Sequence, residues 1–346
     1  MLWPGTAHDT PEDSMSDTLP ALVADIGGTN TRVALADGKV IREQSIRRFR
    51  NAEYNGIDEV LARYMAEEGI SDVAGACVAA AGPLRHGAIV MTNLRDSDDR
   101  PWVIDAGRVS QATGADHVAI LNDLQAQGQA LGHIAPENLR PVVAGPVEAG
   151  GTMLVVGLGT GVNAAPVHET PWGRIVPPSE CGHVNLPAQS DEDFRLVRFI
   201  EHLLDSRGET AHAGVEEVLS GRGLANLHSF AAAEAGGQSE AASAEVLAAL
   251  AAGDATAAHA ARLYTRIVAE MLADQALIHL PYGGIYLIGG MSLAMAPHFA
   301  TFGLEAQFRK PRRIPLLQGE FAITVVADDY AALTGCAVYL ENGGRG

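Results

Sequence analysis

Residues 22–38 read LVADIGGTNTRVALADG, a stretch in which two glycines separate two apolar runs. The runs on either side of Gly27 and Gly28 predict two short strands, at 22–26 and 32–36, joined by a tight hairpin. A nucleotide-binding loop of the common strand–glycine–helix kind would instead open a helix after its glycines. The first glycine loop of this chain is therefore predicted to be a hairpin.

The predicted hairpin carries groups that suit a phosphate. Glycine has no Cβ, so the backbone N–H groups of Gly27 and Gly28 can approach phosphate oxygens, and Thr29 and Asn30 add side-chain donors. Asp25, just before the turn, is placed to hold Mg²⁺ directly or through water. The simpler alternative is that the glycine pair only makes a tight turn.

A second strand–glycine–strand unit lies at 153–167, MLVVGLGTGVNAAPV. Aligning it with the first unit places Gly159 on Gly27, with Gly161 two positions later, which is the pattern of a duplicated hairpin. Thr160 supplies a further hydroxyl donor. Two such hairpins, one in each of two related domains, are suited to clamp a polyphosphate between them.

A third glycine pair, Gly289 and Gly290, follows a predicted strand and opens a predicted helix.

The common nucleotide-binding loops do not fit this chain. The P-loop needs a lysine after its last glycine, and Lys39 and Lys310 are the only lysines present. The dinucleotide fingerprint needs a glycine where Val162 stands. Two glycine hairpins and a third glycine loop, beside the strand-end Asp25, favour a different phosphate site.

Two polar residues close a predicted buried strand at 118–123. Asn122 and Asp123 precede a helix predicted at 124–132, so they lie at a strand-to-helix junction, where ligands gather in α/β sheets. Both residues also suit a helix cap, and the two roles are compatible. An Asp at such a place can take the proton from a hydroxyl group that attacks phosphorus.

The composition limits the class of protein. The chain has 346 residues, 47% hydrophobic and 19% charged, as expected of a soluble protein of two domains. Its formal net charge of −18 and the lack of a Lys/Arg-rich cluster argue against a nucleic-acid partner, and no apolar run is long enough for a membrane. Cys77, Cys181 and Cys336 are scattered, which fits a reducing cytoplasm and predicts neither disulfides nor a zinc cluster.

Taken in order, the motifs resemble those of bacterial glucokinases. These are hexokinase-like sugar kinases with an α/β, two-domain actin-like ATPase (ribonuclease H-like) fold and an interdomain cleft. The similarity runs from about residue 21 to 340. It rests on DIGGTNTR (25–32), MTN (91–93), LND (121–123), GLGTG (157–161), SECGHV (179–184), EEVLSGRGL (216–224) and IGGM (288–291).

The resemblance implies an enzyme that transfers phosphate from ATP, with Mg²⁺, to the 6-hydroxyl of glucose. It assigns the two hairpins and the Gly289-Gly290 loop to ATP, and it makes Asp123 the catalytic base. The sugar ligands that it implies are Asn93, Asn122, Asp123, Glu180, His183 and Glu216. From the residues alone, Glu217 is equally able to face the sugar, and Arg32 reads either as a strand-surface charge or as a phosphate contact.

The domain limits that follow are an acidic, disordered tail at 1–20, a small domain at 21–121 and a large domain at 122–346. The last helix, at about 330–342, is expected to pack back on the small domain. The helices predicted after residue 190, behind a Ser190/Asp193 capping box, offer surface for a homodimer.

Three other functions stay open in principle. A kinase for another hexose, an amino sugar or an anhydro sugar would use the same carboxylates and amide. A sugar-sensing repressor needs DNA-binding helices before Leu22, where only about twenty polar residues stand. An inactive sugar-binding scaffold is disfavoured by the presence of both Asp25 and Asp123.

Three features depart from the family pattern. A polar insertion, RDSDDR at 95–100, precedes Trp102 and leaves the geometry of Asn93 open. Asn163 follows the second hairpin where many members have glycine. The acidic tail before residue 21 has no counterpart with a role that can be assigned. None of these departures removes a predicted catalytic group.

Overall fold

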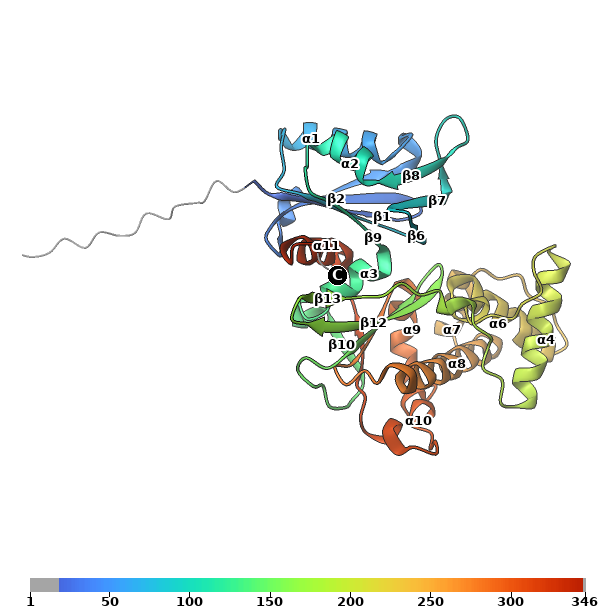
Figure 1. The fold of residues 1–346 in the computed structure, drawn as a ribbon. Helices are drawn as coiled ribbons and strands as arrows, with labels where there is room; N and C mark the ends of the chain where they lie inside the picture. The colour runs from blue at the N-terminus through green and yellow to red at the C-terminus, as the bar shows by residue number, and fades with distance from the viewer. Residues whose placement is uncertain (1–18, 345–346) are drawn as a thin grey trace, which may run out of the picture.

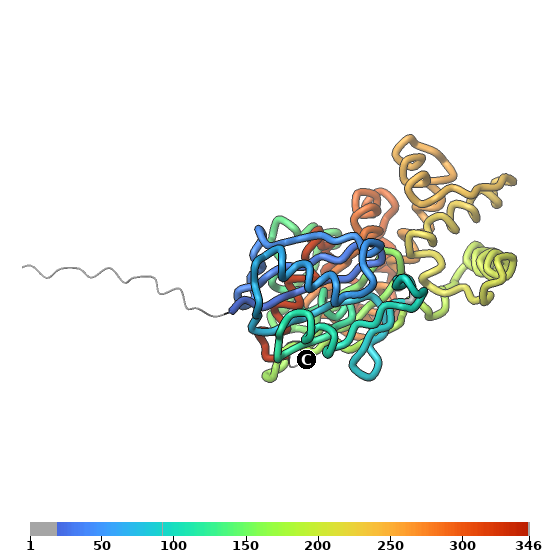
Figure 2. Tube along the Cα trace, turned by 90° about the horizontal axis from the view of Figure 1, so that it is seen from above, coloured from blue at the N-terminus to red at the C-terminus, as the bar shows by residue number. Residues whose placement is uncertain are grey.

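The computed structural model describes residues 19–344, so the predicted tail, apart from Leu19 and Pro20, lies outside the described residues. Within them, two lobes are each built on a six-stranded mixed sheet, with helices α3 (Asp123–Ala130) and α11 (Ala331–Glu341) between the lobes (Figure 1). Seen from above, the chain at about 190–260, drawn in yellow-green to light orange, projects to one side (Figure 2).

The first lobe has a sheet of order β3-β2-β1-β5-β9, and β4 pairs with β2 beside β3. Its strands are β1 (Ala21–Ile26), β2 (Asn30–Asp37), β3 (Val40–Ile41), β4 (Arg47–Arg50), β5 (Ala76–Ala80) and β9 (Val118–Asn122). Helices α1 (Ile57–Glu68) and α2 (Ala106–Thr113) cover one face, and α3 and α11 cover the other. A small sheet adds β6 (Leu84–Arg85), β7 (Ala88–Arg95) and β8 (Pro101–Asp105).

The second lobe has a sheet of order β10-β15-β14-β11-β12-β13. Its strands are β10 (Leu139–Val143), β11 (Met153–Leu158), β12 (Val162–Thr170), β13 (Gly173–Ile175), β14 (Ile285–Ile288) and β15 (Ile323–Val326). Its helices are α4 (Asp191–Ser206), α5 (Glu216–Leu219), α6 (Gly221–Glu234), α7 (Ser243–Ala251), α8 (Ala255–His279), α9 (Gly290–Phe299) and α10 (Leu304–Phe308). The core of this lobe joins β11, β14 and β15 to α6 and α8.

The predicted duplication is confirmed in the pairing of the strands. β1 is antiparallel to β2 and parallel to β5, and β11 is likewise antiparallel to β12 and parallel to β14. In each hairpin the first glycine closes the turn: Gly27 N–H donates to Asn30 O at 3.0 Å, and Gly159 N–H donates to Gly161 O at 3.0 Å. Each lobe therefore presents one glycine hairpin.

Most predicted elements are confirmed, and two need correction. The helix after Asp123 ends at Ala130 instead of reaching a glycine cap; Leu131 caps it in an extended conformation, and Gly132 lies beyond with a φ of +83°. The continuous apolar run VAGACVAAAG at 73–82 also predicts a buried strand, but the strand is confined to Ala76–Ala80, where every residue is buried. Burial on both faces explains why this run is continuous instead of alternating.

The last helix, α11, returns to the sheet of the first lobe. Its Leu333 and Cys336 are fully buried against Val23 and Cys77 of that sheet. At Gly335 the helix touches α3 so closely that an added Cβ would overlap the Ala126 carbonyl group. α11 therefore packs the end of the chain directly on β1, near its beginning, with α3 beside it.

In the part of the chain from 19 to 344, every helix is too short or too polar to span a lipid bilayer.

Candidate active site

Asp123 is the first residue of α3 and follows β9 directly. One carboxylate oxygen, Oδ1, accepts the Leu124 N–H at 2.8 Å. Burial is the main cause that raises the pKa of Asp123 to about 6; the negative charges of Asp25 and Glu180 contribute to the rise, and the hydrogen bond from Leu124 opposes it. Carboxylates from both lobes therefore lie near enough to Asp123 for their charges to act on it.

Asn122 is the N-cap of α3, so the capping interpretation is confirmed. Its Oδ1 accepts the Leu124 N–H at 3.0 Å, and its backbone N–H donates to Oε1 of Gln125 at 3.1 Å, which completes a capping box. Its Nδ2 donates to the Gly82 carbonyl at 2.8 Å. Since the amide has two N–H groups, one donor remains for a ligand.

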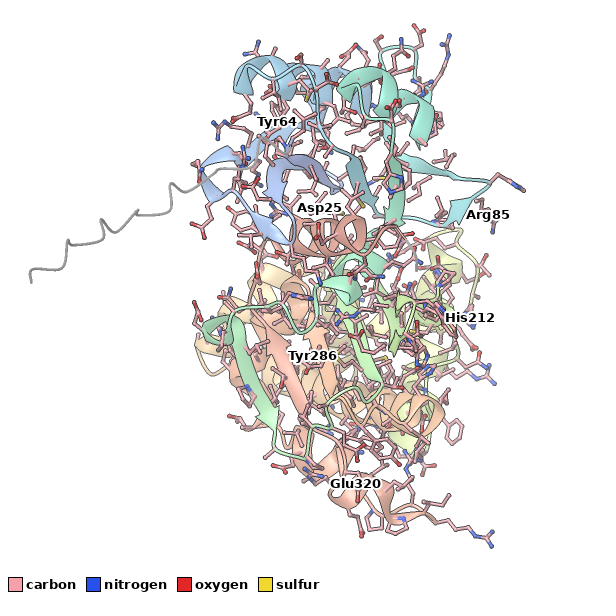
Figure 3. The ribbon with its side chains drawn as sticks, turned by 60° about the vertical axis from the view of Figure 1, so that its left-hand side comes forward. Asp25, Tyr64, Arg85, His212, Tyr286 and Glu320 are labelled. Atoms are coloured by element: carbon pink, nitrogen blue, oxygen red, sulfur yellow. The ribbon has the colours of Figure 1, made fainter. Side chains whose placement is uncertain are left out.

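Asp25 lies on the face of the first sheet that α11 covers (Figure 3). Its Oδ2 is 3.3 Å from Nη1 of Arg32 on the neighbouring strand. Burial raises the pKa of Asp25, and the guanidinium opposes that change. Sequence reasoning left Arg32 out of the site; the cross-strand register of β1 and β2, which pairs these two residues, places it there.

The first hairpin is held by a residue that sequence reasoning missed. Asn51 donates from Nδ2 to the Gly27 carbonyl at 2.8 Å and from its backbone N–H to the Thr29 carbonyl at 2.9 Å. Thr31 in turn donates to Oδ1 of Asn51 at 2.8 Å, and both side chains are buried. Asn51 lies outside every motif, so the sequence contained no signal for this role.

Asn93 lies beside the first hairpin. A Cβ built on Gly28 would come within 2.9 Å of Nδ2 of Asn93, so a side chain at Gly28 would displace this amide from its place. The register of β7 and β8 shifts between Met91 and Arg95, in the stretch that contains Asn93. The polar insertion therefore coincides with a shift in the pairing of β7 with β8, and Asn93 still lies beside the first hairpin.

Glu216, at the start of α5, contacts the second hairpin. Its Oε2 accepts the Val162 N–H at 2.9 Å, and a Cβ on Gly161 would come within 2.9 Å of the same oxygen. Arg222 donates to Oε1 of Glu216 at 2.8 Å and to Oε1 of Glu217 at 2.7 Å. Of the two neighbouring glutamates, Glu216 is the one that reaches the hairpin.

Glu180 precedes a short 3-10 helix (Cys181–His183) and His183 ends it, and both are exposed. Asn163 supports this segment: its Oδ1 accepts the Cys181 N–H at 3.1 Å, and its Nδ2 donates to the Ser179 carbonyl. The departure from the family pattern at Asn163 thus has a structural role. Within residues 19–344, no hydrogen bond joins the His183 side chain to another predicted site residue.

The third glycine loop abuts the second hairpin. Gly289 has a φ of +93°, and a Cβ on it would come within 2.5 Å of the Leu158 carbonyl at the end of β11. Gly290 then begins α9. The positive φ and the close Leu158 carbonyl both exclude a side chain at Gly289. Glycine at this position therefore allows the ends of β11 and β14 to lie side by side.

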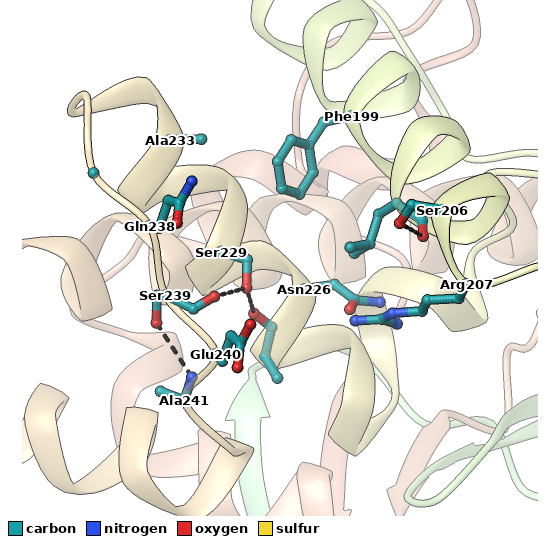
Figure 4. A pocket seen from close by; sticks show the side chains of 13 residues that line it. Phe199, Ser206, Arg207, Asn226, Ser229, Ala233, Gln238, Ser239, Glu240 and Ala241 are labelled. Atoms are coloured by element: carbon teal, nitrogen blue, oxygen red, sulfur yellow. Dashed lines mark hydrogen bonds between the residues drawn. The ribbon is translucent and has the colours of Figure 1, made fainter.

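A separate hollow of about 900 Å³ lies between α4, α6 and residues 237–241 (Figure 4). Phe199, Arg207, Asn226 and Ser239 are among the residues that line it. None of the residues predicted to bind sugar or nucleotide lines this hollow. The candidate active site is therefore the region of the two hairpins and Asp123.

Comparison with known proteins agrees with this geometry. The chain matches the glucokinase family model over residues 22–343. A glucokinase of Marinobacter nauticus is 32% identical over 330 residues, which cover 93% of this chain and 97% of the relative. The crystal structure of a glucokinase from an Antarctic psychrotroph is 26% identical, with a TM-score of 0.80 over 93% of this chain and 99% of its own.

A more distant structure shares the fold. The glucokinase of Balamuthia mandrillaris, solved in complex with glucose, is 20% identical, with a TM-score of 0.76 over 96% of each chain. The family match covers nearly all of the described residues, and both hairpins and Asp123 lie within it. This chain therefore belongs to the glucokinase family and has its α/β, two-domain actin-like ATPase fold.

Proposed function

We propose that Asp123 is the general base of this enzyme, which phosphorylates D-glucose with ATP to give glucose 6-phosphate. The observation that carries the proposal is the partly buried carboxyl of Asp123 at the strand-to-helix junction, whose pKa is raised to about 6 by desolvation and by the charges of Asp25 and Glu180. A base of this strength is largely ionised at neutral pH and still accepts a proton readily. The reaction then needs a hydroxyl group held between this carboxylate and the γ-phosphate.

In the proposed reaction the 6-hydroxyl oxygen of glucose attacks the γ-phosphorus of ATP. A bond forms between that oxygen and phosphorus, the bond from phosphorus to the β,γ-bridging oxygen breaks, and ADP leaves. The hydroxyl proton passes to the carboxylate of Asp123. General-base assistance of this kind contributes about 10²–10⁴ in rate.

The sugar is proposed to bind through Asn93, Asn122, Glu180, His183 and Glu216. Carboxylates accept hydrogen bonds from neighbouring hydroxyl groups, whereas the amides can donate as well. A sugar that lacks one hydroxyl would leave a buried partner unsatisfied, at a cost of about 1–3 kcal/mol. Rates with other hexoses, amino sugars and anhydro sugars would show which of these the enzyme also accepts.

ATP is proposed to lie with its phosphates against both hairpins, at Gly27 to Asn30 and Gly159 to Gly161, and its adenosine near Gly289 and Gly290. Asp25 fits a Mg²⁺ ion that accompanies the nucleotide. Carboxylate oxygens are ligands that this ion prefers, and Asp25 presents such oxygens beside the first hairpin, where its only ion-pair partner among the described residues is Arg32 at 3.3 Å. Bound there, the ion would neutralise charge on the phosphate oxygens.

The domain limits, the cellular location and the assembly of the enzyme are also part of the proposal. The lobes are taken as domains 21–121 and 122–346, which close around the sugar. A cytoplasmic location suits its three free cysteines. A homodimer is the proposed assembly, and light scattering of the purified protein tests it.

The decisive experiment replaces the proposed base. Asp123→Asn keeps a hydrogen-bonding side chain that cannot accept the proton, so kcat should fall by about two to four powers of ten while glucose binding is largely kept. Asp116→Asn is the matched control, because Asp116 is exposed outside the site. Steady-state kinetics and calorimetric titration with glucose measure both effects. A turnover of Asp123→Asn close to that of the control would refute the proposal.

A further inference from the structure

Arginines gather at one edge of the first lobe. The expectation of no basic cluster is wrong at residues 42–50, where an otherwise acidic chain carries Arg42, Arg47, Arg48 and Arg50. Three of these, together with Arg63 of α1, line a hollow of about 620 Å³ at the outer edge of the sheet. A concentration of positive charge in a chain with a net charge of −18 calls for a physical reason.

The strand register connects these arginines to the first hairpin. β2 pairs with β1 on one side and with β4 on the other, so Arg32 stands between Asp25 and Arg48 in a row across three strands. Arg50 stands opposite Asn30, the first residue after the turn. Neighbouring strands are about 4.8 Å apart, so Arg48 and Arg50 begin within a side-chain length of the hairpin.

The alternation of side chains places Arg48 and Arg50 on the face of the sheet that carries Asp25. Phe49 between them is buried on the opposite face, where its ring packs edge-on against Tyr54 and Tyr64 at centroid distances of 5.9 and 6.4 Å. Successive residues of a strand point to opposite faces. The two arginines therefore flank the hairpin on the side where Asp25 and Arg32 form their ion pair.

Arg48 and Arg50 differ from the neighbouring arginines in their ion pairing. Arg42 is 2.6 Å from Asp37, Arg47 is 2.7 Å from Glu68, and Arg63 is 2.6 Å from Glu67. In contrast, Arg48 and Arg50 are exposed, and neither forms an ion pair with any carboxylate in the stretch from 19 to 344. Their charges are thus available to a bound anion.

We propose that Arg48 and Arg50 extend the nucleotide site and bind phosphate groups of ATP. This inference rests on the proposed binding of ATP phosphates at the hairpins. Guanidinium groups bind phosphate through two parallel hydrogen bonds, and two of them offset the repulsion that the acidic chain exerts on a polyanion. The Asn51 N–H bond to Thr29 fixes the end of β4 to the turn, so both arginines keep their place beside it.

The test is a double variant, Arg48→Gln with Arg50→Gln. We expect the KM for ATP to rise about tenfold or more, with kcat and the KM for glucose within twofold of the parent. Arg63→Gln is the matched control, because it removes one positive charge from the same hollow but from the side of α1. Calorimetric titration with a non-hydrolysable ATP analogue, on protein whose melting temperature is unchanged, measures the binding directly.

Each alternative explanation of the arginines predicts a different experimental result. An equal rise in KM for Arg63→Gln would mean that general charge, not contact, is responsible, and would overturn the proposal. Loss of inorganic phosphate binding by the double variant, with an unchanged KM for ATP, would mark a separate anion site and would also overturn it. Retained turnover of glucose in the double variant separates either failure from a failure of Asp123 as the base.

Discussion

Asp123 combines two properties that a general base in this reaction needs. It is held by the Leu124 N–H, so its orientation is set before a sugar arrives. Its pKa is raised by burial, and then by the nearby carboxylates of Asp25 and Glu180. Asn122 beside it belongs to the helix cap and retains one free amide N–H. A single strand-to-helix junction therefore serves both stability and chemistry.

The pKa of Asp123 predicts the acid limb of the pH profile. The base must be ionised to accept a proton, so kcat/KM should fall as the pH falls through about 6 and should be about tenfold below its plateau at pH 5. Steady-state rates with glucose between about pH 5 and pH 8 measure this limb. A profile that stays flat down to pH 5 would show that Asp123 is not the titrating base.

At the scale of elements, α3 and α11 form the layer between the two sheets. α3 packs on β9 and β5 of the first lobe and on β11 and β12 of the second, so a shift of this helix would move Asp123 relative to both hairpins. α11 fixes α3 from the side, and Gly335 allows the two helices to approach closely. The position of the base thus depends on a helix at the far end of the chain.

Gly335 is therefore a sensitive position. Gly335→Ala would force α11 away from the Ala126 carbonyl, and overpacking of this kind costs about 1–3 kcal/mol of the free energy of unfolding. Gly319→Ala is the control, because no atom lies within 4 Å of a Cβ built there and its φ is not positive. Thermal unfolding of both variants gives the comparison; equal melting temperatures would contradict the close packing.

At the scale of the molecule, the two lobes repeat one structural unit, and each lobe carries one glycine hairpin. The first hairpin stands beside Asp25, Arg32 and Asn93, whereas the second is held by Glu216. Glu216 thus contacts a phosphate hairpin and is also a proposed sugar ligand. In the proposed arrangement this carboxylate would join the sugar and nucleotide sites and provide a contact through which one ligand could affect the other.

Binding of glucose should stabilise the whole molecule. At a concentration of 100 times Kd, a ligand that binds only the folded state adds about 2.7 kcal/mol, which for a chain of this size raises the melting temperature by about 4 °C. Differential scanning calorimetry with glucose, and with equal glycerol as the control, measures the shift. Glu180→Gln should reduce it, and an identical shift with glycerol would exclude specific binding.

The sequence by itself determined the local features of this protein. Both glycine hairpins, the buried strand at Ala76–Ala80, the cap at Asn122 and the capping box of α4 depend on residues a few positions apart, and their patterns are visible in the chain. The order of the motifs was enough to indicate the family. These predictions succeeded because strand alternation, glycine geometry and caps are short-range effects.

Only the tertiary structure decided which of these features meet. The charges of Asp25 and Glu180 reach Asp123 from different lobes, Asn51 supports a turn more than twenty residues away in the chain, and the register of β4 brings Arg48 beside Arg32. Such contacts depend on strand register and on the packing of α3 and α11. A one-residue change of register would turn Arg48 to the opposite face, and no local pattern specifies it.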